Sequence, residues 1–301
     1  MGGLAVNILS IGEVLWDIIE SWEHLGGAAL NFAAHAKTLG HSVSFISAVG
    51  EDERGRRVLE TMKAMGLSTR FVHTIPNQPT GTVTVTLNSA GVPDFVIHRP
   101  VAYDFPELSD SDFAELASFP PGWIYYGTLF QMSPVAKALT FRLLESFPKA
   151  WRFYDVNLRK GCYTSALVGE LLALANVVKL NDQESGTLQS MLGRSYKSLE
   201  DFCKATLDQY GWEAICVTRG EAGCALLVGE DYVEARGYKV QVADTVGAGD
   251  AAAAALVHGL EQGWPASEIA DFANRVGALV STHFGGTPDW TIQEAEALTP
   301  A

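Results

Sequence analysis

The chain has 301 residues, of which 48% are hydrophobic and 19% charged, so it can bury a sizeable core and is not a disordered polymer. Its net charge is −14 and its lysines and arginines form no cluster, which excludes the basic stripe that nucleic-acid binding needs. The four cysteines show neither a CxxC pair nor zinc spacing, and neither a signal peptide nor a membrane-length apolar run is present. We expect one cytoplasmic domain over residues 1–301, with no nucleic-acid or membrane partner.

Short β-rich runs alternate with helical patterns along most of the chain. In chain order, the first predicted elements are a strand at 5–12, a helix at 27–40, a strand at 42–50 and a helix at 52–66. Later strands are predicted at 123–127, 151–157, 176–181 and 214–220. This alternation is typical of parallel βαβ units, so we expect a three-layer α/β/α domain with a mostly parallel central sheet.

Two stretches break the alternation. Residues 81–100 contain two β-branched runs joined by a turn, which is the pattern of an antiparallel hairpin, and residues 14–24 form another short β-prone piece. We expect these stretches to build a small β-sheet lid from segments 13–25 and 79–103. Ligands of open α/β sheets bind beyond the carboxyl ends of the strands, and a lid there would exclude water from a small substrate.

The most informative stretch is DTVGAGDAAAAALVHGL, residues 244–260. Glycines at 247 and 249 allow unusual dihedrals and close approach, and the alanine run predicts a helix directly after them. The free N–H groups and partial positive charge of a helix N-terminus suit a phosphate. Asp250 beside such an anion could take a proton from an attacking hydroxyl. For an isolated GxGD, a plain turn with a capping aspartate would be the preferred interpretation.

The full motif resembles the C-terminal signature of the ribokinase-like carbohydrate kinases, also called the phosphofructokinase-B family. The resemblance covers essentially the whole chain. LGGAALNFAAHAKTLG at 25–40 matches the N-terminal Gly-Gly-x-x-x-Asn signature of that family. The segment at 49–67, and then DVNLR, KLNDQE and VTRGEAG, follow in the family's order. The resemblance implies a ribokinase-like fold and an ATP-dependent phosphotransferase that acts on a sugar hydroxyl.

The resemblance also implies roles for individual residues. Asp250 would be the general base, and the N–H groups around Gly247, Ala248 and Gly249 would form the anion hole. The sugar hydroxyls would be bound by Asp17, Gly26, Gly27 and Asn31. Without the family, Asp17 could be a solvated charge in an edge strand and Asn31 an ordinary polar residue on a helix face.

The nucleotide and the ions are placed by the same resemblance. Magnesium and the triphosphate would lie near Asn181 and Glu184, with Glu184 acting through water, although Glu184 could also be an ordinary first-turn helix acid. Arg159 could neutralise charge near the phosphates or be a surface cation. The nucleotide would contact Thr218, Gly220, Gly223 and Asn274. A potassium ion would be held at Asp244, Val246, Ser281 and Gly286.

The identity of the sugar substrate is indicated by residues 12–17 and by the lid segment. GEVLWD at 12–17 and the lid segment resemble the bacterial fructokinase-like branch, which implies that D-fructose is converted to fructose 6-phosphate. HRPVAYD at 98–104 departs from the pattern of many fructokinases, in a lid whose residues would contact the sugar. His98 and Arg99 in the predicted lid hairpin are candidate substrate contacts, although His98 could also be an exposed strand histidine. Arg99 could instead bind the carboxylate of 2-keto-3-deoxygluconate, and a ribokinase also fits.

Two further expectations remain. A non-catalytic sugar sensor or scaffold is the alternative of a different class, which the presence of Asp250 and its glycines disfavours. A homodimer through an edge of the lid is also expected.

Overall fold

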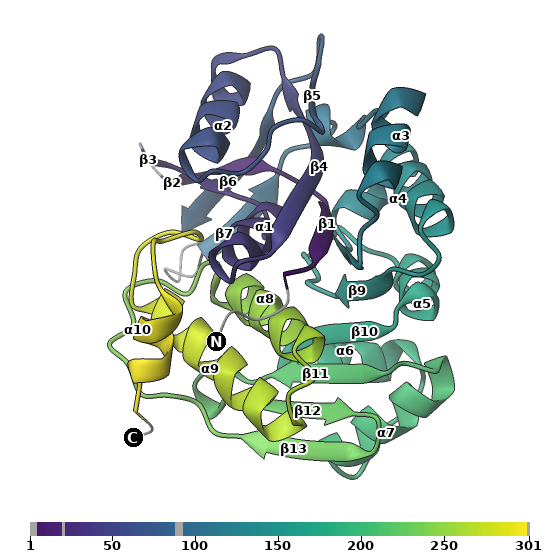
Figure 1. Ribbon diagram of the computed structural model, residues 1–301, viewed down its shortest axis with the longest axis vertical. Coiled ribbons are helices and arrows are strands. Elements are labelled where there is room, and N and C mark those ends of the chain that lie inside the picture. The colour runs from purple at the N-terminus through teal and green to yellow at the C-terminus, as the bar shows by residue number, and fades with distance from the viewer. Residues whose placement is uncertain (1–4, 20–21, 88–92, 300–301) are drawn as a thin grey trace.

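The computed structural model describes residues 5–19, 22–87 and 93–299. Its main feature is a nine-stranded sheet of order β13-β12-β11-β10-β9-β8-β1-β4-β5 (Figure 1). The strands are β1 Asn7–Ile11, β4 Ser42–Gly50, β5 Val72–Ile75, β8 Trp123–Gly127, β9 Trp151–Asp155, β10 Val177–Asn181, β11 Ala214–Thr218, β12 Cys224–Val228 and β13 Asp231–Ala235. Every neighbouring pair from β5 to β11 is parallel, which confirms the predicted mostly parallel sheet.

Helices cover both faces of this sheet (Figure 1). They are α1 Ala28–Thr38, α2 Glu53–Ala64, α3 Asp110–Ser118, α4 Pro134–Ser146, α5 Ser165–Leu174, α6 Asp182–Met191, α7 Leu199–Tyr210, α8 Ala248–Glu261, α9 Ala266–Ser281 and α10 Ile292–Ala297. No helix in the described ranges combines the length and the apolar character that a membrane span requires.

The alternation of side chains along the strands produces two cores. On β8, Trp123 and Tyr125 pack with residues of α1, α8 and α9, whereas Ile124 and Tyr126 pack with residues of α4, α5 and α7. All four side chains are at most 2% exposed. The chain therefore folds as the predicted α/β/α sandwich, with one dry layer on each side of the sheet.

Two strands at one end of the sheet depart from the prediction. β12 and β13 run antiparallel to their neighbours, because the short connection after β11 forms a hairpin instead of a helical crossover. The structure also shortens the strand predicted at 214–220, which ends at Thr218. β12 and β13 therefore extend the sheet beyond the parallel βαβ units that the alternation of helices and strands predicts.

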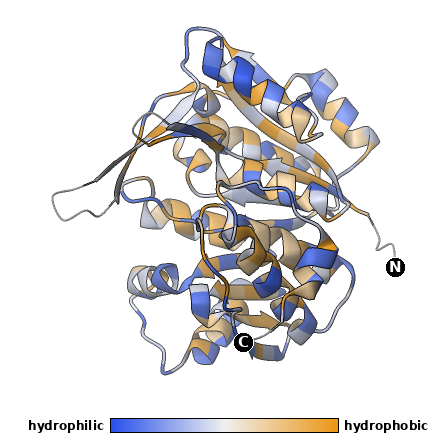
Figure 2. Cartoon of the chain, turned by 90° about the vertical axis from the view of Figure 1, so that its left-hand side faces the viewer, coloured by the Kyte–Doolittle hydropathy of each residue, from blue (hydrophilic) through white to orange (hydrophobic). Residues whose placement is uncertain are grey.

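A second, four-stranded sheet of order β3-β2-β6-β7 projects from one side of the sandwich (Figure 2). Its strands are β2 Leu15–Ile19, β3 Trp22–Gly26, β6 Gly81–Leu87 and β7 Pro93–Ile97. The hairpin predicted within 81–100 is present, with its turn outside the described residues. The β-prone stretch predicted at 14–24 also lies in this sheet, where it contributes to two antiparallel strands, β2 and β3.

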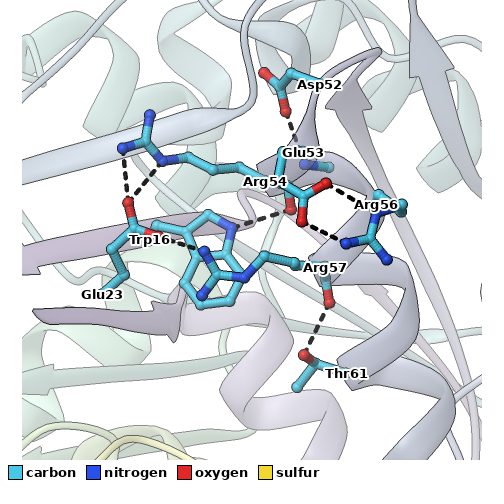
Figure 3. A network of polar contacts seen from close by, with 9 residues as sticks. Trp16, Glu23, Asp52, Glu53, Arg54, Arg56, Arg57 and Thr61 are labelled. Atoms are coloured by element: carbon cyan, nitrogen blue, oxygen red, sulfur yellow. Dashed lines mark hydrogen bonds and ion pairs between the residues drawn. The ribbon is translucent and has the colours of Figure 1, made fainter.

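A cluster of charged and aromatic residues fastens the small sheet to α2 (Figure 3). Trp16 on β2 donates from its indole Nε1 to the Arg54 carbonyl at 3.2 Å, and the Arg57 guanidinium lies 4.2 Å from the indole centre. The guanidinium groups of Arg54 and Arg57 both donate to the Glu23 carboxylate on β3. These hydrogen bonds lower the pKa of Glu23. The cluster fixes one side of the small sheet relative to the sandwich.

Candidate active site

The turn before α8 can form only because of its first glycine. Gly247 caps the helix in the left-handed region, with φ 78° and ψ −14°. A Cβ at this position would lie 2.2 Å from the Gly286 carbonyl oxygen, so the turn packs directly against the backbone of the 286 loop. At Gly249 a Cβ would meet only the Lys179 Nζ, at an ordinary 3.5 Å. Backbone contact thus fixes the position of the α8 N-terminus.

Unpaired N–H groups occur at this turn, as the anion-hole interpretation requires. Among the described residues, the N–H groups of Gly249 and Asp250 have no hydrogen-bond acceptor. The Ala248 N–H has a long hydrogen bond of 3.3 Å to the Thr245 carbonyl. Two of the donors at the predicted anion hole are therefore available to a ligand, and the third is weakly engaged.

Asp250 in the first turn of α8 is joined to Asn31 on α1. The Asn31 Nδ2 donates to the Asp250 Oδ2 at 2.8 Å. The Asn31 Oδ1 is buried and has no partner within the described residues, so it remains an acceptor for a hydroxyl. Burial in the site and the nearby Asp155 carboxylate raise the pKa of Asp250 to about 7, although its side chain keeps partial access to solvent. A carboxylate of this pKa is a good acceptor for a hydroxyl proton at neutral pH.

Asp17 lies on the small sheet, close to two glycines, Gly26 and Gly27, at which there is no room for a side chain. A Cβ on Gly26 would be 2.6 Å from the Asp17 Oδ2, and a Cβ on Gly27 would be 2.3 Å from the Glu13 carbonyl oxygen. Gly27 also has a positive φ of 117° as the N-cap of α1. Burial raises the pKa of Asp17 to about 6, and the Arg159 charge opposes this rise. The two glycines bring β2, β3 and α1 close together.

Asn181 and Glu184 form a capping box at the start of α6. The Glu184 Oε2 accepts from the Asn181 N–H at 2.8 Å, and its Oε1 accepts from the Leu158 N–H at 2.7 Å. Burial raises the pKa of this carboxylate. Each oxygen keeps one lone pair, which fits a hydrogen bond from a metal-bound water but not direct metal ligation. No group of three or more metal-binding side chains occurs in the ranges that the structure describes.

The positions predicted to contact the nucleotide gather beyond β11. Gly220 and Gly223 both have positive φ, and a Cβ on Gly223 would lie 2.1 Å from the Ala235 carbonyl oxygen. The Asn274 Nδ2 on α9 donates to the Ala235 carbonyl at 3.3 Å, which joins this helix to the same place. Thr218 is the last residue of β11. Its hydroxyl makes a long hydrogen bond of 3.5 Å to the Leu180 carbonyl.

The positions predicted to hold potassium lie where two loops meet. The Asp244 Oδ1 accepts from the Val246 N–H at 3.0 Å, and its Oδ2 accepts from the Gly285 N–H at 3.1 Å. Carboxylate and carbonyl oxygens are suitable ligands for a hard cation, so Asp244, Val246 and Gly286 fit the ion by chemistry. The Ser281 carbonyl fits poorly, because it already accepts from the N–H groups of Ala243 and Asp244.

The three predicted contacts around the lid have different surroundings. His98 is exposed, and its Nε2 lies 2.7 Å from the Thr84 hydroxyl. Arg99 pairs with Asp104 and donates to the Leu129 carbonyl at 2.9 Å. Since its guanidinium is already used by the protein, Arg99 is a poor candidate for binding a sugar carboxylate. Arg159 is exposed and forms no ion pair within the described residues, and its charge acts on both Asp17 and Asp250.

The structure reveals further residues at the site that the motifs did not assign. Glu13 follows β1 and caps α1 by accepting from the Ala28 N–H at 3.2 Å. His35 holds the 286 loop, since its Nε2 lies 2.9 Å from the Gly286 carbonyl oxygen and its Nδ1 accepts from the Trp290 indole at 3.0 Å. Asp155 and Lys179 form a buried ion pair. Asp155 is the first residue of DVNLR, and Lys179 is the first residue of KLNDQE. The motifs therefore pointed to the right segments but did not identify these two residues as part of the site.

Comparison with known proteins identifies the family. A family model described as pfkB family carbohydrate kinase matches residues 9–293. A putative sugar kinase of Pyrococcus horikoshii is 29% identical over 97% of this chain and 94% of its own, and fructokinase-1 of Oryza sativa subsp. japonica is 27% identical over 96% and 95%.

Solved structures give the same result for the fold. A fructokinase with bound ATP from Xylella fastidiosa has a TM-score of 0.85 at 22% identity and covers 98% of both chains. An uncharacterized sugar kinase from Pyrococcus horikoshii in complex with ATP has a TM-score of 0.81 at 26% identity, covering 95% of this chain and 96% of that one. The fold is the ribokinase-like α/β fold. The chain belongs to the pfkB family of carbohydrate kinases and is a phosphotransferase that acts on a sugar hydroxyl.

Proposed function

We propose that the enzyme transfers the γ-phosphoryl group of MgATP to the primary 6-hydroxyl of D-fructose. The observation that carries this proposal is the Asn31–Asp250 hydrogen bond of 2.8 Å beside two N–H groups that find no acceptor among the described residues. A carboxylate that could accept a proton and N–H groups that could bind an anion therefore lie within one helical turn. Fructose is favoured as the sugar because fructokinase-1 of Oryza sativa is similar over nearly its full length. The related kinase structure in complex with ATP favours ATP as the donor.

In the proposed mechanism, the Asp250 Oδ1 accepts the proton of the sugar hydroxyl, while the Asn31 amide holds the Oδ2. The hydroxyl oxygen forms a bond to the γ-phosphorus, and the bond from that phosphorus to the β,γ-bridging oxygen breaks to release ADP. The N–H groups of Gly249 and Asp250 would stabilise the charge on the transferred group. Asp17 and the Asn31 Oδ1 would orient the sugar hydroxyls.

Ions would assist this chemistry. Magnesium bound to the triphosphate would neutralise charge, with a coordinated water donating to Glu184. Potassium held by Asp244, Val246 and Gly286 would favour an ordered turn at Gly247. In this proposal the protein's own groups still hold the sugar, accept the proton and present the anion hole. The Thr218–Gly223 turn and Asn274 are proposed to border the nucleotide.

The test is ADP release from MgATP with potassium, measured against D-fructose, 2-keto-3-deoxygluconate, ribose and adenosine. Product analysis by ³¹P and ¹³C NMR should identify fructose 6-phosphate. The variant Asp250→Ala, prepared identically, is the control for contaminating kinases. A clear kcat/KM advantage for another acceptor would overturn fructose as the substrate. MgATP binding with no turnover of any acceptor, at any concentration, would instead favour the sugar-sensor alternative.

We also propose that two copies pair through the small sheet. β3 and β7 are its edge strands, and Ile19, Trp22 and Phe95 on it are 43%, 68% and 59% exposed. Ile19 pairs with Trp22 and with Val85, which pairs with Phe95, so these three large side chains share one face. Light scattering should give a dimer for the native chain and a monomer for Trp22→Ser. A native monomer at high concentration would exclude the pairing.

Use of ATP is in keeping with the proposed cytoplasmic location.

A further inference from the structure

A buried ion pair lies under the catalytic turn. Asp155 at the end of β9 is fully buried, and Lys179 on the neighbouring strand β10 is 7% exposed. The Lys179 Nζ lies 3.0 Å from both carboxylate oxygens of Asp155, which is the residue opposite it in the strand register. The Tyr125 hydroxyl donates to the Asp155 Oδ2 at 3.1 Å. A charged pair in dry surroundings costs desolvation energy, so its retention at this place calls for a reason beyond stability.

The ammonium of this pair touches the proposed anion hole. The Lys179 Nζ lies 3.5 Å from where a Cβ on Gly249 would stand, so it packs directly against the first turn of α8. Gly249 supplies one of the two N–H groups for which the described part of the chain offers no acceptor. A positive charge held there adds to the field of the helix N-terminus, which already favours an anion.

The pair also acts on Asp250. After burial, the Asp155 carboxylate is the main influence that raises the pKa of Asp250, and the Lys179 ammonium is the main one that lowers it. Arg159 and the Asn31 amide also lower this pKa, and the charge of Asp250 raises the pKa of the Tyr125 hydroxyl. The groups facing Asp250 therefore come from α1, from β8, from β9 with the loop after it, and from β10. The two opposed charges of the ion pair are the most strongly coupled to it.

We propose that Asp155 and Lys179 form one positioning unit for the reaction: Asp155 anchors the Lys179 ammonium against Gly249, in the turn that carries Asp250. This inference rests on the proposed function of Asp250 and extends it to two buried residues that the motifs did not assign. Lys179 supports the anion hole through the backbone, while Asp155 prevents that positive charge from making Asp250 too weak a base.

The first test is the pH profile of kcat/KM for the sugar in Asp155→Asn. With the Asp155 charge removed, the Lys179 and Arg159 cations make Asp250 more acidic, so the acid limb of the profile should move about one unit to lower pH. The plateau should fall severalfold, because a weaker base removes the proton less effectively. The matched control is Tyr125→Phe, which removes a hydrogen bond to Asp155 without a charge, and its limb should stay at the native position.

The second test serves if Asp155→Asn does not fold. The double variant Asp155→Asn with Lys179→Met removes both charges and leaves no ion uncompensated. Its acid limb should stay near the native pH, whereas kcat should fall at least tenfold with the sugar KM changed less than twofold. A native kcat in the double variant, or an unmoved limb in a folded Asp155→Asn, would overturn the positioning unit. If Asp250→Ala kept native turnover, the proposed function itself would fail, so the two failures are distinguishable.

Discussion

Helices α1 and α8 run side by side, and a hydrogen bond joins their segments near each end. At the N-terminal end, Asn31 donates to Asp250 at 2.8 Å. Toward the C-terminal end, the His41 Nε2 just beyond α1 lies 3.1 Å from the His258 Nδ1 on α8. Both pairs link the segment of α1 to α8, but their surroundings differ.

The His41–His258 pair is closed. Both side chains are under 9% exposed, the Val6 N–H donates to the His41 Nδ1, and the His258 ring packs edge-on against Trp264. The Asn31–Asp250 pair is open, with the Asn31 Oδ1 buried without a partner and Asp250 partly accessible. Buried polar groups are normally satisfied, so the unsatisfied end is where a ligand completes the structure. We therefore propose that the His41–His258 end of this helix pair is structural and that the Asn31–Asp250 end is reactive.

The largest effect is expected at the reactive end. Asp250→Ala removes the proton acceptor, and we expect turnover to fall by a factor of about 10² to 10⁴. The affinity for MgATP, measured by titration calorimetry, should stay within a fewfold of the native value, because the free N–H groups remain. Asp208→Ala, which removes an exposed acid on α7, is the control and should be fully active. Native turnover of Asp250→Ala would remove the basis for assigning the base.

Gly247→Ala should have the next largest effect. The left-handed backbone costs a non-glycine residue about 1 to 2 kcal/mol, and the new Cβ would also collide with the Gly286 carbonyl. We expect at least a tenfold loss of kcat/KM together with a lower melting temperature. Gly263→Ala is the matched control, because Gly263 has φ 66° with nothing within 4 Å of its Cβ position. Equal losses of activity in both variants would show that the collision does not matter.

The His41–His258 pair should affect the stability of the protein at acid pH and should have little effect on turnover. Burial lowers the pKa of His41 from 6.5 to about 4 and also lowers the pKa of His258. Between pH 6.5 and 4 the two imidazoles therefore bind protons in the unfolded chain but stay neutral in the folded chain. The stability that the neutral pair contributes is complete above about pH 6.5 and is lost as the pH falls toward 4.

His41→Gln should accordingly lower the free energy of unfolding by about 1 to 3 kcal/mol at pH 8, with a smaller further loss at pH 5 than in the native chain. Urea unfolding at both pH values measures this, and kcat at pH 8 should change little. His283→Gln, at an exposed position, is the control. A large loss of kcat in folded His41→Gln would contradict the separation of the two ends.

The smallest effect concerns the small sheet, whose fastening to α2 is independent of both ends. Glu23→Gln weakens the ion pairs with Arg54 and Arg57, each worth at most about 1 kcal/mol near the surface. We expect a sugar KM about twofold higher and less sensitive to salt, with kcat unchanged. Glu60→Gln on α2 breaks a comparable exposed pair with Arg56 that does not reach the small sheet. The same KM change in Glu60→Gln would argue against a role for this fastening.

Much of the fold could be predicted from local pattern. The strands at 42–50 and 123–127 have the predicted bounds, because each is a continuous β-prone run between turn residues. The separate strand β3 was not predicted because its sequence, WEHLG, contains no β-branched residue. The antiparallel strands β12 and β13 were missed because only a short 3-10 helix, Gly220–Ala222, and no α-helix separates β12 from β11.

The site was only partly predictable. Asp250 stood out because glycines and a helix start surround it, but its partner Asn31 is 219 positions away, and only the family resemblance pointed to it. The Asp155–Lys179 pair depends on the register of β9 and β10, which no local pattern specifies. Arg99 was a candidate for the sugar carboxylate, yet Asp104, five residues on, takes its guanidinium. The roles of the other predicted residues stay predictions.

The most direct measurement is the pH dependence of kcat/KM for the preferred sugar in the native enzyme at saturating MgATP. Burial and Asp155 raise the pKa of Asp250 to about 7, and the base must be deprotonated to act, so kcat/KM should fall tenfold per unit below about pH 7. Binding of MgATP measured over the same range controls for titration of the nucleotide. A profile that stays flat down to pH 5 with intact MgATP binding would contradict a base held in these surroundings.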